Sequence, residues 1–109
     1  MKVCVPIGPG GTVGPRWGRA DRVAIAEVAD GAVTGWQEFE VGWDASHDAG
    51  TEGSHHARVV RFLRENAVEV VAAPHVGDGM VRMLGSMGIK LVTGAAGDAR
   101  TAAVAAAAG

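Results

Sequence analysis

Three short apolar runs, each closed by a proline or a glycine, constrain the fold of this chain more than any other feature. They read KVCVPI (residues 2–7), VEVVAAP (68–74) and IKLVTG (89–94). Continuous apolar runs of this length, rich in β-branched residues, are typical of strands that are buried on both faces of a sheet. Helical patterns precede the second and third runs, so the connections are crossovers that place all three strands parallel. The sequence therefore predicts an α/β fold.

The segment 21–41 predicts a β-hairpin that extends this sheet. Two alternating sets of side chains flank the sequence ADGA, in which Asp30-Gly31 suits a tight turn. Before the turn, Val23, Ile25 and Glu27 alternate with Ala24, Ala26 and Val28; after it, Val33, Gly35, Gln37 and Phe39 alternate with Thr34, Trp36 and Glu38. Helices are expected over 54–66, around Met80–Met87 with Gly88 as the terminating glycine, and over the alanine-rich end, with Asp98 near its start. The predicted order is β-β-β-α-β-α-β-α, a mixed five-stranded sheet with helices on its faces.

Length and charge limit the classes of protein that fit. The 109 residues suffice for one domain, expected to span 1–109, and 48% hydrophobic content indicates a globular chain. The formal net charge is −2 without any long basic run, which disfavours a nucleic-acid partner. The apolar N-terminal run is too short for a signal peptide, and no run approaches the roughly 20 apolar residues of a membrane span. We expect a cytoplasmic protein with no membrane partner.

Cysteine chemistry is restricted because Cys4 is the only cysteine. An internal disulfide and a metal cage made of cysteines alone are both excluded, which fits a reducing compartment. Cys4 lies in the middle of the first predicted strand and is expected to be a core residue. Met80, Met83 and Met87 recur at helical spacing and are likewise expected in the core.

The unusual residues converge on one edge of the predicted sheet. The carboxyl ends of parallel strands share an edge, and open α/β folds bind ligands in crevices there. The glycine- and proline-rich segment 8–19 leaves the first strand at this edge, and His75 follows the second apolar run. The helix that begins at Ser54, a good N-cap, runs back antiparallel, so its start at 54–57 points there too. We expect these segments to surround one crevice.

The chemistry of such a crevice favours anions. Arg16 and Arg19 bring positive charge, and helix N-termini bring unpaired N–H groups. Imidazoles add hydrogen-bond donors or ligands for a borderline metal. The only carboxylates expected nearby are Asp78 and either Asp44 or Asp48, so hard cations such as Ca²⁺ fit poorly.

Each of these residues also has a purely structural interpretation. His55 and His56 could be ordinary polar residues at a helix start, and His75 could cap the next helix. His47 falls in a polar loop and is expected to be solvated. For Arg16 we expect a surface ion pair with Asp21 or Glu27. For Trp36 and Trp43 we expect packing on the hairpin or at an interface.

An ordered set of motifs resembles a known family over nearly the whole chain: MKVCVPIG, WGRAD, HHARVVRFL and AAPHVGDGMVRMLGSMGIKLVTGAAGDAR. The family is the dinitrogenase iron-molybdenum cofactor biosynthesis family of the NifX/NifB C-terminal type. The resemblance implies an RNase H-like three-layer α/β fold that binds, carries or inserts an iron-sulfur or molybdenum-containing cluster. It implies cofactor-binding roles for Trp17, Gly18, Arg19, His55, His56, His75 and Gly77, with the three histidines as metal ligands.

Two departures from the family pattern concern this site. Trp17 stands where phenylalanine is usual, which is a mild change. Pro74 stands where glycine is common, and it could alter the direction in which His75 points.

The resemblance implies a non-enzymatic binding or carrier protein whose partners are the metal cluster and the proteins that assemble or accept it. A metal-free sensor of small molecules or anions would use the same pocket and stays an alternative. An RNase H-like enzyme would need several converging carboxylates to hold two metal ions, and the first strand carries none. The exposed edge of the hairpin is compatible with a homodimer.

Overall fold

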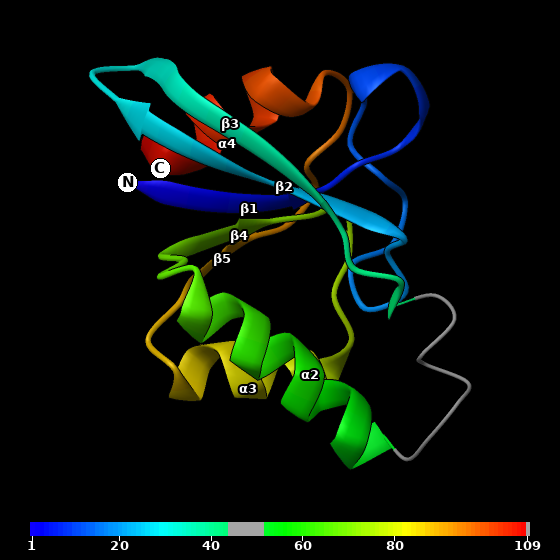
Figure 1. Ribbon diagram of the computed structural model, residues 1–109. Helices are drawn as coiled ribbons and strands as arrows, with labels where there is room; N and C mark the ends of the chain where they lie inside the picture. Colours follow the sequence, from blue (N-terminus) through cyan, green and yellow to red (C-terminus); the bar gives the residue numbers. More distant parts are fainter. Residues whose placement is uncertain (44–51, 109) are drawn as a thin grey trace.

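The computed structural model describes residues 1–43 and 52–108, and its centre is one five-stranded sheet (Figure 1). The strand order is β3-β2-β1-β4-β5. β1 pairs parallel with β4, and β4 with β5, whereas β2 pairs antiparallel with β1 and β3. The predicted mixed sheet, with its three parallel strands, is therefore confirmed. The prediction that all three are buried on both faces is wrong for the strand 90–92, because it lies at the edge of the sheet and its residues are exposed or half-buried. The strands are β1 (Lys2–Pro6), β2 (Arg22–Ala29), β3 (Ala32–Glu40), β4 (Val70–Ala72) and β5 (Lys90–Val92).

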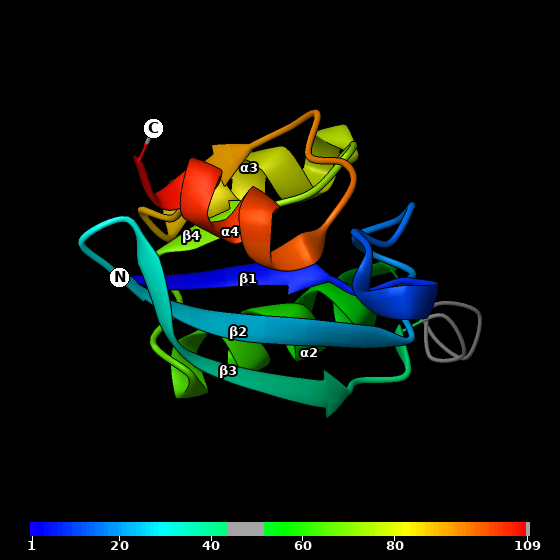
Figure 2. The same cartoon turned by 90° about the horizontal axis from the view of Figure 1, so that it is seen from above.

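Helices cover both faces of the sheet and complete three layers, as predicted. α2 (Glu52–Glu65) and α3 (Asp78–Ser86) lie on one face, and α4 (Ala99–Ala108) lies on the other (Figures 1 and 2). α2 begins two residues before Ser54, so the prediction that Ser54 is the N-cap of this helix is wrong. A short 3₁₀ turn, Pro9–Gly11, interrupts the loop after β1. Among the described residues, every helix is too short or too polar to cross a membrane.

The sheet separates two apolar layers. Val59 and Leu63 of α2 pack with Leu84 of α3 and with Cys4 and Val71 on one face of the sheet. Burying such side chains removes apolar surface from water, at about 25 cal/mol per Å². Small residues allow α4 to lie close to the other face, where its alanines meet the valines of β1 and β4. The residues of that layer include Val3, Ala26, Val70, Ala103 and Ala106.

Local backbone signals account for the turns that hold these elements. Asp30 and Gly31 take φ values of 52° and 74°, the left-handed pair that closes a two-residue hairpin between β2 and β3. At the start of α4, a carboxylate oxygen of Asp98 accepts hydrogen bonds from the backbone N–H and the hydroxyl of Thr101, both at 2.9 Å. The predicted hairpin turn and the placement of Asp98 at the last helix are confirmed.

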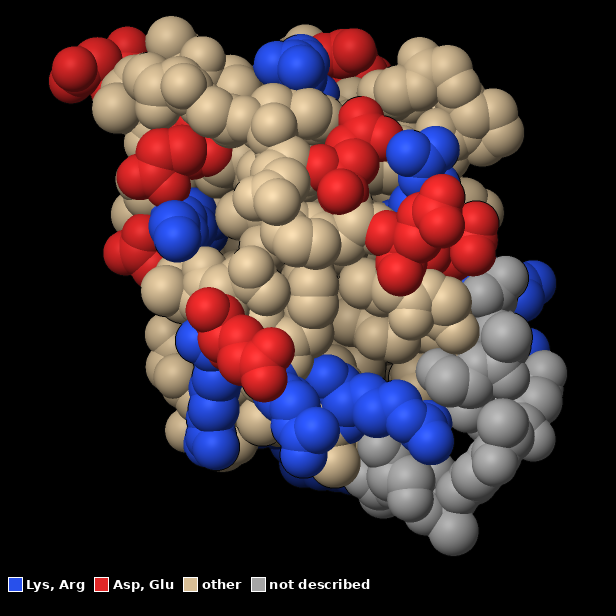
Figure 3. Space-filling view, in the orientation of Figure 1, with Lys and Arg blue, Asp and Glu red and all other residues tan. Residues whose placement is uncertain are grey.

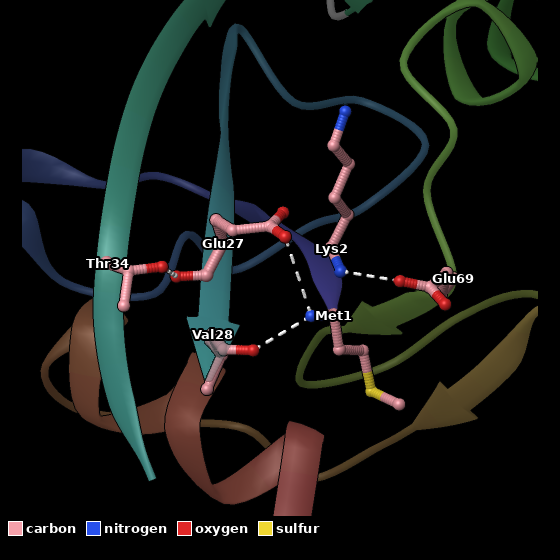
Figure 4. Close-up of polar contacts among 6 residues, drawn as sticks. All are labelled: Met1, Lys2, Glu27, Val28, Thr34 and Glu69. Atoms are coloured by element: carbon pink, nitrogen blue, oxygen red, sulfur yellow. Dashed lines mark hydrogen bonds and ion pairs between the residues drawn. The ribbon is translucent and has the colours of Figure 1, made fainter. Parts of the chain in front are cut away.

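Polar contacts secure the amino end of β1 (Figure 4). The Met1 amino group donates a hydrogen bond of 2.8 Å to the carbonyl of Val28 and lies 3.7 Å from a carboxylate oxygen of Glu27. The Lys2 N–H donates to the Glu69 carboxylate at 2.8 Å. These contacts tie β1 to β2 and to the start of β4, at the end of β1 opposite the glycine-rich loop.

Candidate functional site

A pocket of about 380 Å³ lies where β1 and β4 end, between three segments that are far apart in the sequence. Residues 15–19 come from the loop after β1, residues 55–56 from α2, and residues 75–80 from the turn after β4 and the start of α3. The crevice predicted from the strand order is therefore present. It brings together all of the predicted site residues: Arg16, Trp17, Gly18, Arg19, His55, His56, His75 and Gly77.

The loop that forms the first wall is fixed by its close packing on the end of β1. The Gly14 N–H donates to the carbonyl of Pro6 at 2.8 Å, and Ile7 and Val13 form an isolated β-bridge. A Cβ at Gly14 would lie 3.2 Å from the carbonyl carbon of Ile7, so the backbones approach as closely as glycine allows. This packing sets the position from which Arg16 enters the pocket lining.

Aromatic rings support that wall from behind. Trp17 is buried, and its ring lies 5.2 Å from that of Trp43 at an interplanar angle of 71°. The ring of Trp43 in turn meets that of Phe62 edge-on at 5.6 Å. The backbone N–H of Trp43 donates to the carbonyl of Ala20 at 2.9 Å. The indole N–H of Trp17 is buried and has no hydrogen-bond partner among the described residues. Such a donor is costly to leave unsatisfied, and here it belongs to a pocket residue.

The three histidines occupy different depths. His55 is 2% exposed, and its ring lies 6.0 Å from the ring of the half-buried His56. His75 is exposed at the end of the turn. Within the described residues, no three His, Cys, Asp or Glu side chains are grouped closely enough to hold one metal ion. The imidazoles therefore share a pocket without forming a three-ligand metal centre.

The N-terminus of α3 forms another part of the lining. Its N-cap, Gly77, has no side chain to cap the helix, and the first helical hydrogen bond runs from Val81 to Gly77 at 2.9 Å. The N–H groups of residues 78–80 consequently have no acceptor within the helix. They carry the positive end of the helix dipole to the pocket, and the Asp78 carboxylate stands beside them.

One predicted contact is wrong, and some predicted residues lie outside the described part of the chain. Arg16 is exposed and forms no ion pair with Asp21 or Glu27, because Glu27 lies at the far end of β2, beside the Met1 amino group. His47 and the two candidate carboxylates of the same segment, Asp44 and Asp48, fall outside the described residues.

Sequence reasoning missed two features of this region. A second cavity of about 380 Å³ shares Pro15, Arg16 and Arg19 with the pocket and extends toward Arg22. The support that Trp43 gives to Trp17 was also missed, since packing on the hairpin or at an interface was expected. The length of the glycine-rich segment was the available signal for the cavity; nothing in the sequence indicates the pairing of the two rings.

Comparison with known proteins places these observations in a family. The family model described as "Dinitrogenase iron-molybdenum cofactor" matches residues 1–109. No curated protein matches the chain.

Solved structures share the fold at low sequence identity. The protein PH0822 superposes with a TM-score of 0.74 at 19% identity, over 97% of this chain and 88% of that one. The apo form of the orange protein from Desulfovibrio gigas gives 0.73 at 23% identity, over 93% and 82%. A putative NifB protein from Thermotoga, assigned to the DUF35 family, gives 0.70 at 22% identity, over 99% and 88%. At these identities the likeness shows the fold alone, whereas the family model covers every residue. The chain belongs to the dinitrogenase iron-molybdenum cofactor family.

Proposed function

We propose that this protein is a carrier that binds an anionic metal-sulfur cluster, of the iron-sulfur or molybdenum-containing type, in the pocket between β1, α2 and α3. The observation that carries the proposal is the composition of the pocket lining in a member of this family. Cationic side chains, imidazoles and helix N–H groups line one cavity, and Asp78 supplies the single carboxylate that the described residues bring to it. The cluster is the cargo of the protein, not a resident catalytic group.

Charge supplies the first part of the binding. The guanidinium groups of Arg16 and Arg19 stay protonated at every accessible pH and offer several N–H donors each. Both side chains are exposed at the pocket, so they meet an incoming anion before it is desolvated. The N-terminus of α3 adds backbone donors on the opposite side. An anion bound between them would replace water on both sides.

The imidazoles supply the second part. His56 and His75 reach solvent at the pocket and are the residues proposed to ligate or hydrogen-bond the cluster directly. His55 is buried in the wall and is proposed to contribute through its position beside Gly18 and His56. Because the three rings do not converge on one point, the proposal gives the cluster at most one or two imidazole ligands, with the remainder of its binding from charge and N–H donors.

The proposed role is to receive the cluster from an assembly protein and to pass it to an acceptor, without chemical conversion. The family description supports a cofactor-related role, and the pocket supports an anionic cargo. A pocket whose arginines and His75 reach solvent also suits a cargo that must be released intact.

Anaerobic titration of the protein with synthetic tetrathiomolybdate and with a synthetic iron-sulfur cluster tests the proposal. Wild type, Arg19→Ala and the double variant His56→Ala/His75→Ala are compared at about pH 5.5 and about pH 8, on either side of the range in which imidazoles ordinarily titrate. Lys90→Ala, on β5, is the control variant. We expect Arg19→Ala to weaken binding at both pH values and the control to bind like wild type.

The pH dependence assigns the role of the histidines. Stronger binding at the higher pH, lost in the double variant, indicates direct ligation by neutral imidazole. Stronger binding at the lower pH indicates docking by protonated imidazolium. Equal affinity in all variants would refute the pocket as the site. Molybdate or phosphate binding as tightly as the sulfur-containing anions would refute a cluster cargo and support an anion sensor.

A further inference from the structure

Arginine side chains are concentrated on the solvent side of the α2–α3 layer. Arg58, Arg61 and Arg64 follow one another at three-residue intervals along α2, and Arg82 is exposed on α3. In Figure 3 the Lys and Arg side chains gather in the lower part of the view, over α2, whereas Asp and Glu are more numerous above, over the β2–β3 hairpin. The chain as a whole carries a formal charge of −2, so this cluster of positive charge reflects an uneven distribution of charges over the surface and not an excess of cations.

Three of these four arginines are not paired within the described part of the chain. Arg61, Arg64 and Arg82 form no ion pair with any described residue, although the structure records pairs elsewhere, such as Arg22 with Glu38 at 3.0 Å. Like charges three residues apart on a helix repel one another. Within the described part of the chain, Arg61 and Arg64 are therefore exposed cations without a counter-ion.

An apolar groove adjoins these arginines. It has a volume of about 390 Å³ and lies between the end of β3 and α2. The rings of Phe39 and Phe62 meet edge-on in its lining, 5.2 Å apart. An apolar centre surrounded by charged residues is the usual anatomy of a protein–protein interface. The apolar lining consists of Phe39, Val41, Trp43 and Phe62, and the charged lining of Glu40, Arg58, Arg61 and Glu65.

We infer that the groove and the arginines of α2 form a docking surface for an acidic segment of a partner protein. The segment would place an apolar side chain between Phe39 and Phe62 and its carboxylates against Arg61 and Arg64. The apolar lining of the groove disfavours a nucleic-acid backbone, which binds through dense positive charge.

The surface begins beside the pocket. Arg58 lies one helical turn after His55 on α2, and Arg58 lines the groove while His55 lines the pocket. A partner seated on the groove would therefore stand close to the pocket. The groove and the charged side chains of α2 are separate from the proposed cluster site, so a partner could dock there whatever the pocket binds.

Binding of a short fluorescein-labelled peptide, in which one phenylalanine is flanked on both sides by glutamates, tests the inference by fluorescence anisotropy. Two charge-reversal variants are compared: Arg61→Glu/Arg64→Glu on the surface, and Lys90→Glu/Arg100→Glu on β5 and α4. Each replaces two cations by two carboxylates, so both change the net charge equally. We expect the first variant to lose about tenfold or more in affinity and the second to stay within about twofold of wild type.

Further measurements make the result decisive. Peptides with glutamine for glutamate, or alanine for phenylalanine, should each bind more weakly. Circular dichroism confirms that both variants are folded. Equal loss in the two variants would reduce the effect to net charge and overturn the inference. So would absence of peptide binding, or tighter binding of a single-stranded DNA oligonucleotide lost only in Arg61→Glu/Arg64→Glu. His56→Ala/His75→Ala should bind the peptide normally, which separates this surface from the cargo site.

Discussion

A Cβ atom at Gly18 would stand 3.6 Å from Nε2 of His55, so the loop after β1 faces the start of α2 across the space of a single methyl group in the pocket wall. The two residues belong to segments joined only through the β2–β3 hairpin and the chain that follows it. A side chain introduced at position 18 would therefore meet the buried ring of His55.

Substitution of Gly18 should depend steeply on size. Gly18→Ala places its methyl group at an ordinary contact distance from His55 and should leave stability nearly unchanged. Gly18→Val adds two methyl groups against a ring that is 2% exposed and should lower the free energy of unfolding by about 1–3 kcal/mol. Urea denaturation of both variants checks this. Equal midpoints for Val and Ala would show that the ring moves aside freely.

Leu63 should be essential to the layer beneath α2. Its side chain is fully buried among residues of the sheet and of α3, so Leu63→Ala should lower the free energy of unfolding by about 2–5 kcal/mol. Val81→Ala is the control, because Val81 is 42% exposed on α3 and should change stability by less than about 0.5 kcal/mol. Similar losses in both variants would contradict the packing described for this face.

Asp98 should make the stability of α4 depend on pH. Hydrogen bonds from the Thr101 backbone, and then from its hydroxyl, lower the pKa of the Asp98 carboxyl below its ordinary value. A lowered folded-state pKa means that the stabilisation is present above the unfolded pKa of about 3.9 and is lost as the pH falls through the folded pKa.

The Asp98→Ala variant should accordingly be less stable than wild type at neutral pH, with a difference that shrinks as the pH falls below about 4. Asp98→Asn is the matched control, since an amide oxygen still accepts from Thr101 but does not titrate in this range. Denaturation midpoints at several pH values measure the difference. A gap between wild type and Asp98→Ala that stays constant down to the lowest pH would exclude the carboxylate as its source.

Cys4 should be chemically inert in the folded protein. Burial raises the pKa of the Cys4 thiol, so it remains protonated as well as inaccessible. A thiol-specific reagent at mildly alkaline pH should leave the native protein unlabelled and should add one label per chain in denaturant. Rapid labelling without denaturant would mean that β1 is readily exposed.

The parallel direction of β1, β4 and β5 was predictable because apolar runs separated by helical patterns require crossovers. Burial on both faces holds for β1 and β4 but not for β5, an edge strand with exposed and half-buried residues. The lengths of these strands were not predictable. The run 68–74 pairs as a strand only over Val70–Ala72, and the run 89–94 only over Lys90–Val92. The flanking residues are apolar for other reasons: Val68 and Ile89 pack under the sheet while their backbones already turn toward the helices. The hydrophobicity of a residue indicates that it is buried, but it does not indicate where hydrogen bonding between neighbouring strands ends.

The location of His55, His56 and His75 at the same pocket was likewise predictable, because it follows from the direction of the strands. The depth of each ring was not, since it depends on the helix phase and on neighbours such as Gly18. The pairing of Trp17 with Trp43 also lay beyond the sequence. It requires the chain after β3 to return to the loop, where Gly42 and Trp43 donate to the carbonyls of Asp21 and Ala20. No local pattern encodes a contact between turns so far apart.

The tryptophans divide into two optical environments. Trp17 and Trp43 are buried and in ring contact behind the pocket, whereas Trp36 lies on the other side of the sheet with the Arg100 guanidinium 4.5 Å from its ring. The fluorescence of Trp17 and Trp43 therefore originates next to the pocket, and a bound molecule that absorbs at their emission wavelengths would quench it by energy transfer. Tryptophan fluorescence would thus report whether the pocket is occupied, with the more distant Trp36 as an internal reference.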